Sequence, residues 1–103
     1  MSTQPPTLHP SLANEFSAKF LELTDMVFVD GALSAKTKEL IAVAAAHVTL
    51  CEHCIERHTR RAVKFGATKS ELTEAIWVGI AMRAGAAVHR SHVAFSTIES
   101  MRH

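Results

Sequence analysis

Apolar side chains recur every three or four residues along nearly the whole chain, and this helical period is the strongest constraint on its fold. Sixteen of the 103 residues are alanine, which favours helix. No stretch keeps up the apolar–polar alternation of a half-buried strand, and no Asn-Gly hairpin turn occurs. The sequence therefore predicts an all-α fold of about five helices. Its length suits a single domain over residues 1–103, with a loose, proline-bearing arm at residues 1–10.

The helix boundaries are predicted from residues that typically begin or end helices. The first helix should cover about residues 11–27. The second should begin after Ser34 and end near His47. A capping box at residues 49–52, with Thr49 as the cap, should open a third helix that stops at Gly66. A second capping box at residues 68–71 should open a fourth helix that ends near Arg83. We expect Gly85 to mark a break before a last helix over about residues 87–101; the alternative is a continuous helix across Gly85, at a cost of about 1 kcal/mol.

The fourth predicted helix lacks a polar face. Every residue between Ala75 and Met82 is apolar or glycine, including Trp77, so this segment has no side that favours water. A chain of about 100 residues buries only about two-thirds of its unfolded surface. We therefore expect a homo-oligomer in which a second subunit covers this helix. The alternative is a central helix wrapped by the other four within one subunit.

Charge and hydropathy exclude several kinds of partner. The formal net charge is +1, from 11 basic and 10 acidic residues, which predicts neither a nucleic-acid nor an anionic-membrane surface. The longest nearly apolar run, residues 75–88, contains Arg83 and is shorter than the roughly 20 residues that span a bilayer. Residues 1–10 lack the pattern of a secretory signal, so we expect a cytoplasmic location.

The two cysteines, Cys51 and Cys54, are separated by only two residues. A disulfide between them would close a very short loop, so it would add little stability as a staple. Redox or metal chemistry is the better interpretation in a chain that reads as cytosolic. Residues three apart on a helix have Cα atoms about 5 Å apart, a separation that a disulfide can bridge. The pair can therefore open and close with little backbone motion.

Ionisable side chains near the cysteines could support thiol chemistry. His58 follows Cys54 by four residues, so its imidazole should lie near that sulfur as a proton acceptor. Glu39, on the preceding helix, is the available carboxylate to orient the imidazole. The start of a helix stabilises a thiolate, which favours Cys51 as the more acidic thiol, whereas the His58 spacing favours Cys54 as the attacking one.

The complete pattern resembles the core motif of AhpD-like alkylhydroperoxidases in the carboxymuconolactone decarboxylase superfamily. It consists of Glu39, eleven residues, Cys51-Glu52-His53-Cys54, three residues and His58, within a resemblance that covers roughly residues 34–88. The resemblance implies helical subunits assembled as trimers or hexamers, and a dithiol peroxidase that reduces organic hydroperoxides without a cofactor or metal.

In that pattern Cys54 matches the peroxide-attacking thiol and Cys51 the resolving thiol, which meets a dithiol reductant such as a lipoyl or thioredoxin-like protein. His58 and Glu39 match the proton relay, and His53 matches an additional histidine between the cysteines. We expect Cys54 to attack first, following the family pattern and the position of His58.

Three other interpretations remain open. The cysteines could bind zinc together with His58, or with His89 and His92, although structural zinc usually holds such a pair in a turn. The chain could be a decarboxylase acting on a γ-carboxymuconolactone-type ring, which needs no cysteine pair. It could also be a redox sensor without turnover. A basic run in the third helix is expected to be a solvated face that could attract an acidic redox partner; it comprises Arg57, Arg60, Arg61 and Lys64.

Overall fold

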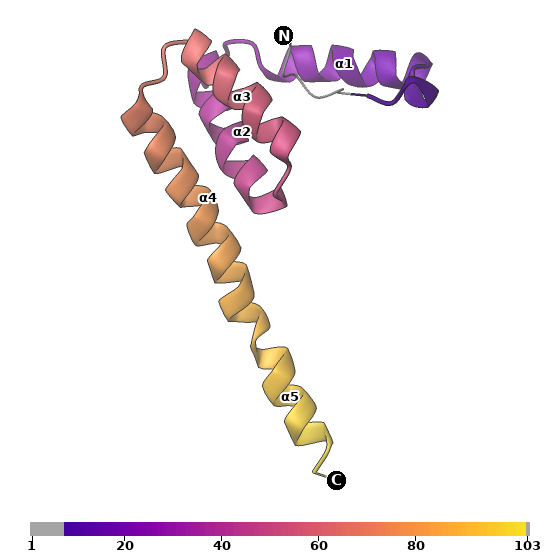
Figure 1. Ribbon diagram of the computed structural model, residues 1–103, viewed down its shortest axis with the longest axis vertical. Helices are drawn as coiled ribbons and strands as arrows, with labels where there is room; N and C mark the ends of the chain where they lie inside the picture. The colour runs from indigo at the N-terminus through magenta and orange to yellow at the C-terminus, as the bar shows by residue number, and fades with distance from the viewer. Residues whose placement is uncertain (1–7, 103) are drawn as a thin grey trace.

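The computed structural model describes residues 8–102, and every regular element in that range is helical (Figure 1). This confirms the all-α prediction and the number of helices. A short 3-10 helix, η1 (Pro10–Leu12), comes first, followed by α1 (Glu15–Val27), α2 (Ala35–Thr49), α3 (Glu52–Lys64), α4 (Lys69–Arg90) and α5 (His92–Ser100).

Helix α2 lies at the centre of the subunit and packs against both α3 and α4. Its buried residues recur at helical spacing: Ala35, Glu39, Val43 and Ala46. On α4 the contact requires Gly79, because a Cβ at that position would collide with the backbone carbonyl oxygen of Ala44 and crowd the Cβ of His47. Small residues thus let α2 and α4 approach closely, while the opposite face of α4 stays uncovered.

Several predicted helix ends are confirmed. The Ser34 hydroxyl accepts a hydrogen bond from the Thr37 amide at 3.1 Å and caps α2. Thr68 and Glu71 form the predicted reciprocal capping box at the start of α4. Helix α3 stops before Gly66, as expected: the φ of Gly66 is 94°, in the left-handed region, and the Ala67 amide donates to the Ala62 carbonyl.

The capping box predicted at residues 49–52 is wrong. Thr49 is the last residue of α2, and Leu50 adopts the left-handed conformation (φ 58°, ψ 37°). The Cys51 amide donates to the Ala46 carbonyl at 3.1 Å, which closes the end of α2, and Cys51 itself is the N-cap of α3. Two residues therefore connect the helices, because one left-handed residue is enough to reverse the chain.

Two other predicted boundaries are wrong. Helix α4 continues through Gly85 to Arg90, so the break falls at Ser91 and the last helix begins at His92. A glycine within a helix costs only about 1 kcal/mol, which the helical hydrogen bonds on both sides can offset. The first helix begins at Glu15 rather than near residue 11, because Asn14 caps it with a reciprocal bond to Ser17. Of the predicted N-terminal arm, residues 1–7 lie outside the described residues.

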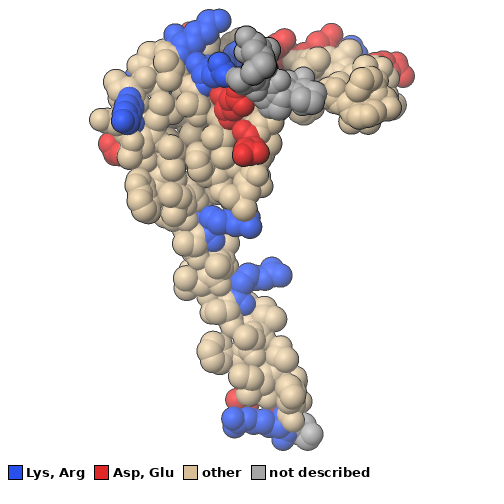
Figure 2. Space-filling model, in the orientation of Figure 1, with Lys and Arg blue, Asp and Glu red and all other residues tan. Residues whose placement is uncertain are grey.

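The subunit is open rather than spherical. Its principal extents are 57 × 38 × 34 Å and its radius of gyration is 18.3 Å, compared with about 13 Å for a compact domain of this length. Helix α1 and the end of α4 with α5 project away from the α2–α3 pair (Figure 1). Figure 2 shows a mostly uncharged surface along the α4–α5 projection. No helix between residues 8 and 102 combines the length and apolar content needed to cross a membrane.

The apolar segment of α4 is not wrapped within one subunit. The side chains of Trp77 and Met82 are each 63% exposed, and other large apolar residues on the same helix are also exposed. The alternative of a central helix wrapped by the other four within one subunit is therefore wrong. The buried apolar core of the described residues consists of small side chains, Ala35, Val43, Ala46 and Ala62.

Candidate active site

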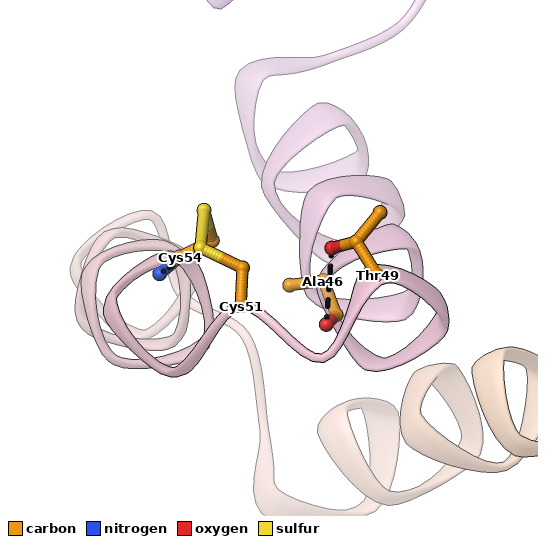
Figure 3. The surroundings of a disulfide bond; sticks show 4 residues. All are labelled: Ala46, Thr49, Cys51 and Cys54. Carbon is orange, nitrogen blue, oxygen red and sulfur yellow. Dashed lines mark hydrogen bonds between the residues drawn. A yellow bond between two sulfur atoms is a disulfide. The ribbon is translucent and has the colours of Figure 1, made fainter.

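The two cysteines form a disulfide at the start of α3, beside the C-terminal end of α2 (Figure 3). Their Cα atoms are 5.2 Å apart, which agrees with the spacing expected from the sequence. The Cys54 amide points to the Cys51 Sγ atom at 3.2 Å, so this sulfur occupies the position of a helix-capping acceptor. Both residues are partly exposed. The pair is thus bonded and partly open to solvent.

His58 lies one turn beyond Cys54 on α3, and its ring is paired with the carboxylate of Glu39 from α2. The distance from His58 Nδ1 to Glu39 Oε1 is 2.6 Å. Glu39 is 0% exposed and the His58 side chain is 14% exposed. Phe28, in the segment between α1 and α2, stacks on the imidazole with ring centroids 5.0 Å apart. Two helices that are consecutive in sequence therefore bring together the predicted acid and imidazole.

This contact determines which nitrogen of His58 is available. A carboxylate accepts hydrogen bonds and does not donate them, so His58 Nδ1 carries the proton that Glu39 accepts. In the neutral ring the lone pair then lies on Nε2. The arrangement fixes both the orientation and the tautomer of the imidazole, as a general base requires.

Arg61 is a site residue that the sequence analysis missed. Its Nε donates to Glu39 Oε2 at 2.7 Å, and its side chain is 36% exposed. The interpretation of Arg61 as part of a solvated face is therefore wrong. Arg60 does lie on the surface, where it pairs with Glu56 at 2.8 Å. The available signal was spacing, because Arg61 follows His58 by three residues and so shares its helix face.

His53 lies between the cysteines in sequence but is not part of the Glu39 cluster. It is partly buried, and its Nδ1 is a buried side-chain atom without a hydrogen-bond partner in the described part of the chain. The structure therefore places four of the five predicted residues in two contacts, the disulfide and the Glu39–His58 pair. It leaves His53 beside them with an unused nitrogen.

The described residues do not provide a set of ligands for the zinc site considered above. Within residues 8–102 no group of three or more His, Cys, Asp or Glu side chains is placed to hold a metal ion. His89 and His92 lie at the junction of α4 and α5, where the His92 Nδ1 atom pairs with the His89 carbonyl at 2.7 Å. The His92 ring is thus hydrogen-bonded within this junction.

The chain is similar to known proteins, in sequence and in structure, over most of its length. A Paracoccus denitrificans protein, uncharacterized protein 4 in the cox locus, is 50% identical over 82 residues, which is 80% of this chain and 74% of that protein. A solved structure from Methanobacterium thermoautotrophicum is 33% identical with a TM-score of 0.71, covering 79% of this chain and 88% of that one.

A Thermotoga maritima protein is similar at 29% identity and a TM-score of 0.67, over 87% of this chain and 93% of that one. It is a carboxymuconolactone decarboxylase family protein with a possible involvement in the antioxidative response. The sequence profile of the carboxymuconolactone decarboxylase family matches residues 14–94. This range includes all of α1 to α4 and the whole candidate site. As the cysteine motif predicts, this chain belongs to the carboxymuconolactone decarboxylase family.

Proposed function

We propose that the protein is a thiol-dependent peroxidase that reduces organic hydroperoxides through a Cys51–Cys54 dithiol–disulfide cycle. The observation that carries the proposal is the disulfide in the first turn of α3, with a carboxylate-oriented imidazole one turn along the same helix. Such an arrangement supplies a nucleophile, a proton acceptor and a resolving thiol. The possible antioxidative role of the Thermotoga relative supports the same class of reaction.

In the proposed reaction Cys54 attacks the peroxide. His58 Nε2 accepts the thiol proton, and the Cys54 thiolate attacks the terminal oxygen of ROOH. The O–O bond breaks, an S–O bond forms, and the leaving alkoxide takes the proton from His58 to become an alcohol. Cys54 is then a sulfenic acid. The Cys51 thiol attacks its sulfur, the disulfide forms, and one water molecule leaves.

A dithiol then restores the enzyme. One of its thiols attacks Cys51 and passes its proton to His58, and the departing Cys54 thiolate takes that proton to become a thiol. The second thiol of the donor attacks the mixed disulfide, so that the donor leaves as a disulfide and Cys51 as a thiol. We propose a lipoyl or thioredoxin-like protein as the donor.

A peroxide-consumption assay with dihydrolipoamide or thioredoxin as donor tests this function. Turnover should be lost in both Cys51→Ser and Cys54→Ser. Dimedone should trap a sulfenic acid in Cys51→Ser after one peroxide equivalent, and it should trap none in Cys54→Ser. Trapping in Cys54→Ser would reverse the assignment of the two thiols.

The same assay separates the peroxidase from the other interpretations. A redox sensor would form the disulfide with peroxide but show no steady-state consumption of the donor. A decarboxylase would keep its lactone activity in Cys51→Ser, since that chemistry needs no cysteine pair. Either result would contradict the peroxidase proposal.

We further propose that the functional unit is a homo-oligomer, a trimer or hexamer. The chain exposes 8122 Å², whereas a compact monomer of 11.2 kDa would expose about 5,700 Å². The excess of about 2,400 Å² exceeds the roughly 800 Å² per partner of a standard interface. A buried core of three alanines and one valine is small for a stable domain. The exposed apolar face of α4 is the proposed contact.

A further inference from the structure

We infer that Arg61 is a positioning residue of the proposed relay: it holds the buried Glu39 carboxylate against His58 Nδ1, so that the ring keeps its proton on Nδ1 and its Nε2 remains free to accept a proton. This inference rests on the proposed function, because it assigns a task to a residue of the same site. It goes beyond the cysteine motif, which does not include Arg61.

The geometry divides the two carboxylate oxygens between two donors. Glu39 Oε1 receives the hydrogen bond from His58 at 2.6 Å, and Oε2 receives that from Arg61 at 2.7 Å. Both donors come from one face of α3, whereas the acceptor comes from α2. Because Arg61 holds Oε2, the carboxylate cannot rotate away from the imidazole without breaking a charged hydrogen bond.

Charge is the second part of the argument. Glu39 is 0% exposed, so water does not compensate its negative charge, and the Arg61 guanidinium is the permanent cation that does. His58 contacts the Glu39 carboxylate from α2 and the uncharged ring of Phe28 from the segment before α2, and Arg61 from its own helix reaches the same carboxylate. The charge that His58 contacts is therefore one half of the Glu39–Arg61 ion pair.

Removing the Arg61 cation favours an added proton on the Glu39–His58 pair, because the buried negative charge then has no permanent counterion. If that proton is on the ring, the imidazole is a cation and has no lone pair. If it is on the carboxyl group, that group donates to Nδ1, and the ring proton moves to Nε2. In both cases Nε2 cannot accept the thiol proton. Loss of Arg61 should therefore impair the relay at low and neutral pH and spare it at high pH.

The test compares Arg61→Gln with Arg61→Lys and with Arg60→Gln, whose arginine pairs with Glu56 on the surface. We would measure two pH profiles on the full chain: peroxide turnover, and the protonation of the His58 ring by NMR of the reduced protein. In Arg61→Gln both profiles should move to higher pH, which lowers turnover about tenfold or more at neutral pH. Arg61→Lys keeps the positive charge, so its two profiles should lie close to those of the unmodified protein. The profiles of Arg60→Gln should match those of the unmodified protein.

The outcomes separate this inference from the proposed function. An unshifted His58 profile in Arg61→Gln, or an equal loss of rate at every pH, would overturn the role of Arg61. Absence of peroxide turnover in the unmodified protein would overturn the proposed function, while the NMR profile would still test Arg61.

If Arg61→Gln does not fold, the double variant Glu39→Gln/Arg61→Gln leaves no unpaired charge in the site. Its profiles should equal those of Glu39→Gln alone, because Arg61 acts through Glu39. A further shift in the double variant would contradict the inference.

Discussion

The α2–α3 hairpin and a second, C-terminal arm formed by residues 84–102 are both helical, but they differ in what surrounds their side chains. The hairpin buries Glu39 and ties it to two residues of α3. All but one of the described residues of the arm are exposed, and its apolar side chains include Val88, Phe95 and Ile98. A polar cluster thus organises the region with the proposed chemistry, whereas the arm presents apolar surface.

The contrast suggests a division of tasks. The hairpin forms the disulfide and the Glu39 contacts within one chain, so its geometry does not require a partner. The arm and the outer face of α4 leave large apolar side chains in water, which is unfavourable by about 25 cal/mol for each Å². The following substitutions test whether the two regions can be changed independently.

The largest effect should come from charging the outer face of α4. In Trp77→Asp/Met82→Asp the two carboxylates would oppose burial, so the proposed oligomer should dissociate completely. Light scattering after size-exclusion chromatography would measure the mass. Glu74→Gln, an exposed polar change on the same helix, should keep the mass unchanged. A monomeric unmodified protein would refute the proposed assembly.

Next in size should be the loss of the buried carboxylate. Glu39→Ala removes the acceptor for both His58 and Arg61, and we expect the free energy of unfolding to fall by about 2–3 kcal/mol. The misoriented base should also slow peroxide turnover by about 100-fold or more. Urea unfolding and the peroxide assay measure these losses. Glu39→Gln should preserve more stability, since its amide oxygen still accepts one hydrogen bond.

Two glycines of α4 offer a matched pair. Gly79→Ala places a methyl group against the Ala44 carbonyl, so α2 and α4 must separate, at a cost of about 1–3 kcal/mol. Gly85→Ala meets no atom within 4 Å of the new Cβ and should stabilise the helix by about 0.5–1 kcal/mol. Thermal unfolding of the two variants should shift in opposite directions. Shifts of the same sign would show that α4 does not approach α2 as described.

A smaller gain is expected at the connection between α2 and α3. Leu50 adopts φ of 58° while its side chain is 65% exposed, so little packing offsets the strain of the left-handed backbone. Leu50→Gly should stabilise the folded subunit by about 0.5–1 kcal/mol, with the disulfide retained. Denaturant unfolding of the oxidised protein measures this. A marked loss of stability would mean that the Leu50 side chain is covered in the assembly.

The smallest effect should come from the surface capping box of α4. The hydrogen bond from the Thr68 amide, with the nearby Lys36 ammonium, lowers the pKa of Glu71 from its usual value. A lowered folded-state pKa gives stability that is present above the unfolded pKa and lost as pH falls through the folded value. Glu71→Gln should therefore reduce stability slightly at pH 7 and converge with the unmodified protein in acid. A constant difference across this range would exclude the charge as the cause.

Much of the secondary structure could be predicted because it depends on neighbours in sequence. The helical period, the Ser34 cap, the Thr68–Glu71 box and the stop at Gly66 involve residues within five positions of one another. The errors at Thr49 and Gly85 have a related origin. Capping patterns and glycine only bias the backbone. Helix α2 continues until the Cys51 amide bonds to the Ala46 carbonyl, and the hydrogen bonds of α4 continue through Gly85 to Arg90.

The sequence by itself determined that the chain is helical and that Cys51, Cys54 and His58 share one stretch of helix, since their spacing sets their relative positions. Only the tertiary structure decided that Glu39 is fully buried and that Arg61 turns inward to meet it. Those contacts join residues 19 and 22 positions apart. They depend on the angle and register at which α2 packs on α3, which no local spacing specifies. The exposed face of α4 is also a property of the packing, because a sequence shows that a segment is apolar but not what covers it.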